Sequence, residues 1–258
     1  MGPLVTDGDV MFQEIDRKKA IVDRYRPLPR EIALNLKKYF DLELTYNSNA
    51  IEGNTLTLTE TKVILEDGLT VGHGKTLKEH LEVINHKEAI DYIEDVVNRN
   101  LDINETIIKQ LHYIILKTID NKNAGKYRNI NVLISGSRHR PPEHYLVQEK
   151  MEELIKWYQE NKNNLHPIIL AAKFHHKFTF IHPFVDGNGR CARLLMNLIL
   201  LRHGYPPAVI KLEERKEYME ALEKASTEND LSEFINIVAK AVERSLDIYL
   251  YALGVKEN

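Results

Sequence analysis

A twelve-residue stretch, HPFVDGNGRCAR at positions 182–193, gathers residue types that phosphate chemistry needs. Gly187 and Gly189 carry no side chain, so their backbone amides can approach a ligand closely. These amides lie at the predicted start of an apolar helix, where the helix dipole is positive. Arg190 and Arg193 are three residues apart, so both side chains lie on one side of the first turn. Free amides and two guanidinium groups together predict an anion cradle suited to phosphates.

Two more side chains of this stretch add catalytic chemistry. Asp186 offers a hard oxygen ligand of the kind that Mg²⁺ uses beside substrate phosphates. His182 can take a proton from a hydroxyl near neutral pH. Each signal is weak alone, because a GNG triplet is common in loops and a lone histidine after an apolar helix is more often a core residue. Their joint occurrence within twelve residues predicts a base, a metal ligand and a polyphosphate site. His175 and His176, further upstream, are predicted to be core residues.

An acidic residue near the N-terminus raises a separate question. The stretch SNAIEGN at 48–54 reads as the end of a helix, with Gly53 as the left-handed cap. Glu52 then lies in the last turn, where the helix dipole already places about −0.5 of a charge. Either this glutamate is simply solvated, or a cationic group from elsewhere in the chain pairs with it.

Apolar periodicity predicts a mainly α-helical chain that positions these residues. Two capping boxes, Thr57 with Glu60 and Thr76 with Glu79, open two of the helices, and Asn104 can cap a third. The expected helices cover, approximately, residues 32–51, 58–67, 77–98, 105–115, 147–158, 167–180, 194–201, 213–226 and 231–250.

One segment differs from this helical pattern. Residues 129–134, NINVLI, alternate and are β-branched, and the turn residues Ser135, Gly136 and Ser137 follow. This pattern predicts a short β-hairpin over about 128–140. A connecting loop is the alternative, because a lone hairpin is marginal in water.

Composition restricts the class of protein. The chain has 258 residues, a net charge of −3 and a single cysteine, Cys191. No intramolecular disulfide can therefore form, and a reducing compartment fits. The overall charge attracts neither nucleic acid nor an anionic membrane, and there is no apolar run long enough for a transmembrane helix. The first residues lack the order of a signal peptide, so we expect a cytoplasmic protein.

The stretch at 182–193 resembles the signature of the Fic family, H-x-F-x-[DE]-G-N-G-R-x-x-R, and matches it at every defined position. Other segments are similar to the animal endoplasmic-reticulum Fic enzyme and its prokaryotic relatives. They include AGKYR at 124–128, NLHPIILAAKFHHKF, GYPP and RKEYMEAL, and the resemblance covers about residues 45–252. The membrane anchor and tetratricopeptide repeats of the animal enzyme are expected to be missing.

The resemblance implies a Fic-fold helical bundle with a β-hairpin flap and an N-terminal helical extension. The extension would span residues 1–70 and contain an inhibitory helix at about 44–53. The catalytic core would span residues 71–258. It would contain the flap at about 128–140 and the motif loop at 182–193.

The resemblance also implies an activity, the transfer of AMP from ATP to Ser, Thr or Tyr hydroxyls of target proteins and of the enzyme itself. His182 would be the base that deprotonates the hydroxyl. Asp186 would hold Mg²⁺ on the α- and β-phosphates. Asn188, with the amides of Gly187 and Gly189, would orient the α-phosphate and stabilise its transition-state charge.

Further contacts follow from the same resemblance. Arg190 would contact the β-phosphate and Arg193 the γ-phosphate, whereas Phe184 would pack inward and anchor the loop. Tyr218 and Met219 lie where relatives cover the adenine. Gly189 is a lysine in Doc-type kinases, so its presence here favours nucleotidyl transfer over phosphoryl transfer.

The flap would pair its edge with the backbone of the target protein and so place the acceptor hydroxyl in line with the α-phosphate. Val132 and Ile134 are the candidate residues for this contact.

The stretch at 48–54 fits an inhibitory pattern of the family, [ST]-x-x-x-E-[GN], through Ser48, Glu52 and Gly53. The cation that pairs with Glu52 would be Arg193. We therefore expect Glu52 to occupy the space that the γ-phosphate needs and to inhibit the enzyme in cis.

Several alternatives remain open at this point. Glu52 could instead position a water that removes AMP from modified proteins, which would make the chain mainly a de-AMPylating enzyme. A non-catalytic ATP-binding interaction module and transfer of another group are two more alternatives. A nucleic-acid regulator is disfavoured, because no basic recognition helix is visible. A homodimer is possible, since Leu42, Leu44 and Val71 could serve an interface or the core.

Overall fold

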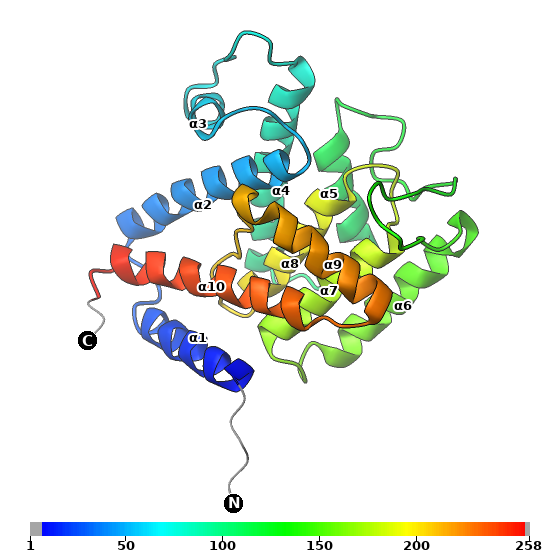
Figure 1. The fold of residues 1–258 in the computed structure, drawn as a ribbon. Coiled ribbons are helices and arrows are strands. Elements are labelled where there is room, and N and C mark those ends of the chain that lie inside the picture. The colour runs from blue at the N-terminus through cyan, green and yellow to red at the C-terminus, as the bar shows by residue number, and fades with distance from the viewer. Residues whose placement is uncertain (1–6, 256–258) are drawn as a thin grey trace, which may run out of the picture.

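The computed structural model describes residues 7–255, with side chains from residue 12 onward. Over that range the chain forms ten α-helices and two short 3₁₀ helices and has no β-strand (Figure 1). The prediction of a mainly α-helical bundle is confirmed. The absence of a signal peptide was inferred from the first twelve residues, and residues 1–6 of these lie outside the described range.

All nine helices expected from the periodicity are present, and an additional helix precedes them. The elements in order are α1 (Asp7–Asp23), α2 (Arg30–Ile51), α3 (Leu58–Asp67), α4 (Leu77–Asn98), α5 (Glu105–Leu116), η1 (His144–Leu146), α6 (Val147–Asn161), α7 (Pro167–Ile181), α8 (Asn188–Arg202), η2 (Leu212–Glu214), α9 (Arg215–Glu228) and α10 (Ser232–Ala252).

Side-chain caps fix three of the helix starts where the sequence predicts them. Both capping boxes are closed in both directions, at Thr57 and at Thr76. Asn104 accepts a hydrogen bond of 3.0 Å from the backbone N–H of Ile107. These caps satisfy amides that would otherwise lack a partner at a helix start.

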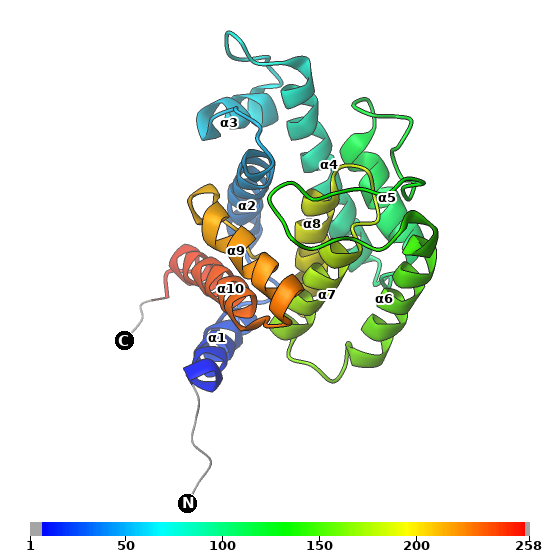
Figure 2. The same ribbon diagram turned by 45° about the vertical axis from the view of Figure 1, so that its right-hand side comes forward.

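The centre of the fold is α8, which packs against α7, α4 and α5 (Figure 2). Every residue from Arg190 to Leu200 is buried. A helix that is apolar on nearly all sides needs such a central position. Its N-terminus, where the motif loop begins, is therefore held rigidly by three neighbouring helices.

The long helix α2 brings Glu52 to this centre. It packs on α3 and α4 and also touches α8, η2 and α10, while α10 lies between α1 and α2 (Figures 1 and 2). Leu44 belongs to the hydrophobic core. The division of the chain at residue 70 and the possible homodimer both stay predictions.

The predicted β-hairpin flap is not formed. Residues 129–140 run as an extended loop with a single backbone–backbone hydrogen bond between its own residues, from Ser137 N to Ile134 O at 3.2 Å. No neighbouring strand is present in the described part of the chain, so the alternating residues have no ladder to join. Side chains hold the loop instead, because Ser137 and the backbone N–H of Arg138 both bind Glu223 of α9.

Burial lowers the pKa of five histidines in or around the helix bundle. The pKa of His86 is lowered to about 3 and those of His112, His176 and His182 to about 4, in each case mainly by burial. Burial also holds the pKa of His175 well below its usual value. These rings are therefore neutral in the folded protein at pH 7.

The free energy of unfolding is expected to fall as the pH drops from about 6.5 towards about 4. In that window the unfolded chain binds protons that the folded chain does not, so acid favours unfolding. Each such proton contributes about 1.4 kcal/mol per pH unit. Urea unfolding between about pH 7 and about pH 5 measures this slope.

His86→Leu should reduce that slope by about one proton, because neither ring nitrogen of His86 has a hydrogen-bond partner among the described residues. The exposed His144, changed to Asn, is the control and should leave the slope unchanged. A stability that stays flat over this pH range would contradict the neutral buried histidines.

Across residues 7–255, no helix combines the length and the apolar character that crossing a membrane requires.

Candidate active site

The motif loop is shaped by two residues in the left-handed region. His182 ends α7 with φ 51°, and Gly187 precedes α8 with φ 78°. Asn188, the first residue of α8, closes the loop. Its Oδ1 accepts from Phe184 N at 3.0 Å and its Nδ2 donates to Phe184 O at 2.9 Å. Both polar groups of this side chain therefore hold the loop, and the contact of Asn188 with the α-phosphate stays a prediction.

His112 of α5 supports the loop from below. Its ring stacks on Phe184 with a centroid distance of 3.6 Å and an interplanar angle of 2°. Gly125 N donates to Nδ1 at 2.9 Å, so the proton of the neutral ring is on Nε2. Nε2 then donates to Asp186 O, also at 2.9 Å. This contact fixes the backbone just before Gly187.

Arg128 connects the flap to the candidate base. It is 3 % exposed, and its Nε donates to His182 O at 2.8 Å while Nη1 donates to Ile130 O at 2.9 Å. Its backbone N–H also donates to Pro183 O. Backbone carbonyls thus satisfy this buried cation, and these bonds tie the start of the flap to the backbone of His182.

The imidazole of His182 faces the cleft in front of α8. Burial lowers its pKa to about 4, although the Thr179 backbone favours the protonated ring. Its Nδ1 is buried and has no hydrogen-bond partner within the described residues. A neutral imidazole at pH 7 can accept a proton, which is the role the sequence predicts.

Arg193 is almost fully buried and binds the end of α2. Its Nη2 donates to Glu52 Oε1 at 2.7 Å and to Ser48 O at 2.9 Å. Its Nε donates to Ser48 Oγ at 3.0 Å. The structure therefore brings together Ser48 and Glu52 of the inhibitory pattern and Arg193, the cation expected to pair with Glu52.

The carboxylate of Glu52 lies directly over Gly189. A Cβ atom placed on Gly189 would be 2.2 Å from Glu52 Oε1 and 3.1 Å from Arg193 Nη1. Only a glycine leaves room for this carboxylate at the N-terminus of α8. An anion already occupies the volume above the first turn, where a phosphate would approach the helix.

Arg190 has a different acidic partner. Its Nη1 lies 3.3 Å from Glu82 Oε1 on α4, and its Nη2 lies 3.7 Å from Asp186 Oδ1. Glu82 also accepts a hydrogen bond of 2.9 Å from Asn54, just after the turn that ends α2. The arginine expected to contact the β-phosphate is thus held by α4.

Tyr218 of α9 contacts Arg193 through its hydroxyl. The ring is 1 % exposed, and its oxygen lies 3.3 Å from Arg193 Nη1 and 2.9 Å from His175 Nε2. The hydroxyl accepts from the arginine and so is left to donate to His175. Met219, next to it, lines the cleft. The predicted adenine contacts of both residues stay predictions.

One cleft of about 460 Å³ joins these groups. Its wall contains Glu52, His182, Gly189 and Arg193, and part of the flap completes it. Of the two predicted flap contacts, Ile134 lines this cleft, whereas Val132 is not among the lining residues.

Arg215 also lines the cleft and explains how α2 tolerates an acid at its end. Its Nε donates to Ile51 O at 2.8 Å, so a cation caps the negative end of this helix. Together with Arg193, it surrounds the end of α2 with positive charge. Glu52 is therefore paired with a cation rather than simply solvated.

Four residues of the site were missed by sequence reasoning, namely Glu82, His112, Arg128 and Arg215. Arg128 and Gly125, the partner of His112, both lie in the AGKYR segment that carries part of the resemblance. That segment was a usable signal. Arg215 opens RKEYMEAL, which also carries part of the resemblance, whereas Glu82 lies on a helical pattern that gave no signal.

A metal ion would have one protein ligand here. The side chain of Asp186 is 56 % exposed and lies next to the amide-rich start of α8. The described residues contain no cluster of three or more His, Cys, Asp or Glu side chains that could hold a metal. A single carboxylate fits Mg²⁺, which commonly takes its remaining ligands from substrate phosphates and water.

Sequence comparison matches residues 102–200 to the Fic/DOC family. The chain is 38 % identical over 255 residues to a protein named protein adenylyltransferase Fic from Nematostella vectensis, which covers 95 % of this chain and 58 % of the relative. It is 39 % identical over 217 residues to the protein of the same name from Drosophila melanogaster, covering 84 % and 43 %. The chain thus spans about half the length of these curated relatives.

Solved structures give the same assignment. A Fic domain-containing signalling protein from Bacteroides thetaiotaomicron superposes with a TM-score of 0.84 at 31 % identity, covering 96 % of this chain and all of that one. Fic-1 from C. elegans superposes with a TM-score of 0.84 at 33 % identity, covering 96 % and 74 %. With a complete signature at 182–193 and a shared fold over nearly its whole length, the chain belongs to the Fic/DOC family.

Proposed function

We propose that this chain is an autoinhibited protein adenylyltransferase. It would move AMP from ATP to Ser, Thr or Tyr hydroxyls of target proteins and of itself. The names of its curated relatives support this activity. The observation that carries the proposal is a single cleft containing a neutral His182, the amide-rich start of α8 and Arg193.

In this proposal the target hydroxyl gives its proton to His182 as its oxygen attacks the α-phosphorus of ATP. A bond forms between that oxygen and the α-phosphorus, the bond to the β-phosphate oxygen breaks, and pyrophosphate leaves. The amides of Gly187 and Gly189 would stabilise the charge that develops on the α-phosphate. Asp186 would hold Mg²⁺, which neutralises part of the phosphate charge when bound.

Glu52 would keep this activity low. Its carboxylate lies over Gly189 and pairs with Arg193, so the γ-phosphate would meet an occupied volume and a negative charge. ATP would then bind with its α-phosphate out of line with the acceptor hydroxyl.

The test of the activity uses the Glu52→Gly variant with each nucleoside triphosphate and Mg²⁺. Mass spectrometry of the intact protein should show an AMP adduct with ATP, and peptide mapping should place it on a Ser, Thr or Tyr side chain. The matched control is Glu52→Gly combined with His182→Ala, which should carry no adduct. Lack of an adduct with every nucleotide would refute the proposed transfer.

Removal of AMP from modified proteins is the second candidate. Among the described residues, Glu52 Oε1 binds Arg193, whereas no hydrogen bond is recorded for Oε2. This second oxygen could orient a water towards a bound AMP phosphate. AMP-modified Glu52→Gly protein is purified and mixed with wild-type protein, and it should lose its AMP if removal dominates. Unmodified Glu52→Gly protein, added in place of wild type, should not remove the AMP.

A further inference from the structure

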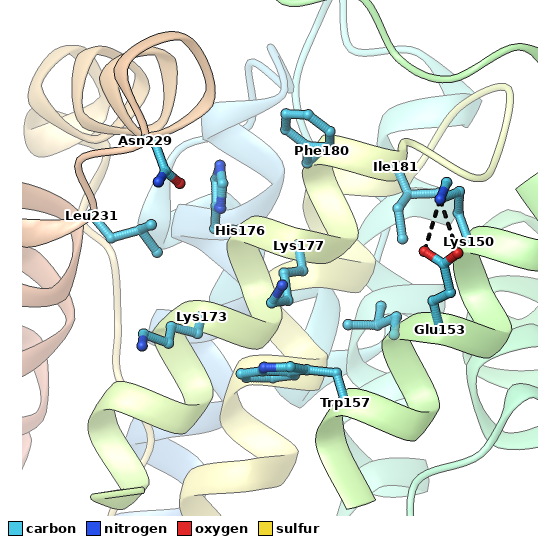
Figure 3. Close-up of a pocket in the computed structure, with 11 residues that line it drawn as sticks. Lys150, Glu153, Trp157, Lys173, His176, Lys177, Phe180, Ile181, Asn229 and Leu231 are labelled. Carbon is cyan, nitrogen blue, oxygen red and sulfur yellow. Dashed lines mark hydrogen bonds and ion pairs between the residues drawn. The ribbon is translucent and has the colours of Figure 1, made fainter. Parts of the chain in front are cut away.

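A second cleft, of about 550 Å³, lies beside the active site (Figure 3). It is formed by α6, α7 and the turn between α9 and α10. Its lining residues are Lys150, Glu153, Leu154, Trp157, Lys173, His176, Lys177, Phe180, Ile181, Asn229 and Leu231. None of the roles assigned above uses this cleft.

Two aromatic side chains, Trp157 and Phe180, line opposite ends of this cleft (Figure 3). Trp157 is half-buried and Phe180 is 37 % exposed. Figure 3 shows the Trp157 indole lying flat below Lys177, and Lys177 Nζ is 5.0 Å from the ring centroid. An aromatic surface with a cation above it binds flat or branched apolar side chains while favouring negative charge nearby.

The positive charge of the cleft is not balanced. Lys150 pairs with Glu153 at 2.8 Å. For Lys173 and Lys177, by contrast, no ion pair is recorded within residues 12–255. Burial, and then the neighbouring charge of Lys173, lower the pKa of Lys177, and the charge of Glu153 only partly opposes them. An incoming carboxylate would relieve the repulsion between these two cations.

The cleft shares a wall with the active site. His176 lines the second cleft, and its Nε2 lies 3.2 Å from Ser226 Oγ. Ser226 in turn lines the catalytic cleft. His139 of the flap hydrogen-bonds to Phe180 O at 2.8 Å, and the two rings are 4.0 Å apart. A protein segment that reaches His182 along the flap would therefore continue over Phe180 and into the second cleft.

We propose that this cleft docks an acidic segment of the target protein that carries a large apolar side chain, next to the modified hydroxyl. This rests on the proposed adenylyltransferase activity and names its substrate class. The apolar side chain packs beside Lys177 against Trp157 and Phe180, and the acidic groups face Lys173 and Lys177. An apolar centre with charged residues at its margin is the usual anatomy of a protein interface.

A small anion is a poorer fit to the same walls. The one buried polar side chain in the lining, His176, has its Nε2 engaged with Ser226, so it is not aimed into the cleft. Small-molecule sites commonly carry convergent polar groups that fix the ligand, whereas this cleft offers flexible lysines at an open margin.

Fluorescence of Trp157 tests docking without any need for catalysis, because it is the only tryptophan in the chain. Wild-type protein is titrated with peptides that share an acceptor threonine and a leucine and differ only in Glu or Lys flanks. The Glu peptide should change the emission in a saturable way. Binding should be about tenfold weaker in Lys173→Gln/Lys177→Gln.

Lys156→Gln is the matched control. This lysine lies on α6 next to Trp157, is 76 % exposed and does not line the cleft. It should bind the Glu peptide as wild type does. Three results would overturn the proposal: no saturable change with the Glu peptide, a change that survives in the double lysine variant, or an equal change with inorganic phosphate or AMP.

A kinetic experiment separates this proposal from the proposed activity. In the Glu52→Gly background, the Glu peptide should accept AMP with a kcat/KM about tenfold above that of the Lys peptide. The double lysine variant should lose this preference and keep the same KM for ATP. Transfer without a preference overturns the docking site alone. Lack of transfer to any peptide overturns the activity, and the fluorescence titration still decides whether the cleft takes acidic segments.

Discussion

Glu52→Gly is expected to raise self-AMPylation with ATP and Mg²⁺ by about tenfold or more over wild type. The substitution removes the carboxylate that lies over Gly189 and pairs with Arg193 at 2.7 Å. The γ-phosphate could then reach Arg193 and align the α-phosphate with the acceptor hydroxyl. Incorporation of labelled AMP into the protein, measured as an initial rate, checks the increase.

The size of this effect depends on how strongly Glu52 is held. Keeping the active arrangement at about one per cent requires a bias of roughly 2.7 kcal/mol. Arg193 is buried, but the side chain of Glu52 is 34 % exposed, and one carboxylate oxygen makes the contact. Such a pair lies between an exposed one, worth roughly 0–1 kcal/mol, and a fully buried one. The remainder of the bias comes from the Glu52 carboxylate, which occupies the volume that the γ-phosphate needs.

Two further variants sharpen the result. Glu52→Gln keeps the volume and loses the charge, so it should activate less than Glu52→Gly. Glu66→Gln, a half-exposed acid on α3, is the control and should leave the rate at the wild-type level. An unchanged rate in Glu52→Gly, with a normal melting temperature, would discard the inhibitory role.

His182→Ala is expected to lower AMP transfer by about 10²–10⁴-fold in the Glu52→Gly background while leaving ATP binding nearly unchanged. The imidazole is neutral at pH 7 because burial lowers its pKa to about 4, and the other imidazole in the cleft wall, His139, is hydrogen-bonded to Phe180 O at 2.8 Å. ATP affinity from calorimetry and the rate of AMP incorporation are measured on the same preparation.

The backbone at this position demands a second variant. His182 has φ 51°, a left-handed conformation that costs alanine roughly 1 kcal/mol. Asparagine tolerates this conformation better, so His182→Asn should be equally inactive and more stable. If either variant loses ATP binding instead of transfer, His182 is a structural residue rather than the base.

The local parts of this site were predictable from sequence. Spacing alone indicated that α8 starts after a glycine-rich loop, with Arg190 and Arg193 in its first turns. The capping boxes at Thr57 and Thr76 fixed two helix starts, because each box is a contact between residues three apart. Such features need no knowledge of the rest of the chain.

The remaining contacts depend on how distant helices pack. Arg190 meets Glu82 only because α4 lies against α8, and Arg193 meets Tyr218 only because α9 lies across the cleft. No periodicity encodes these partners. The predicted β-hairpin at about 128–140 is wrong for a related reason. Alternating residues form stable strands only where a neighbouring strand or packing surface supports them, and the described residues provide no strand beside this loop.

The contact between Glu52 and Gly189 has a consequence for the resting protein in a cell crowded with anions. A bare, positively charged helix start would collect free phosphate, citrate or polynucleotides as competitors. Here the Glu52 carboxylate acts as an internal counter-ion, so other cellular anions find this binding volume already occupied. Productive binding of the nucleotide then depends on an event that moves the Glu52 side chain. The position of this one carboxylate therefore both excludes other anions and keeps the resting activity low.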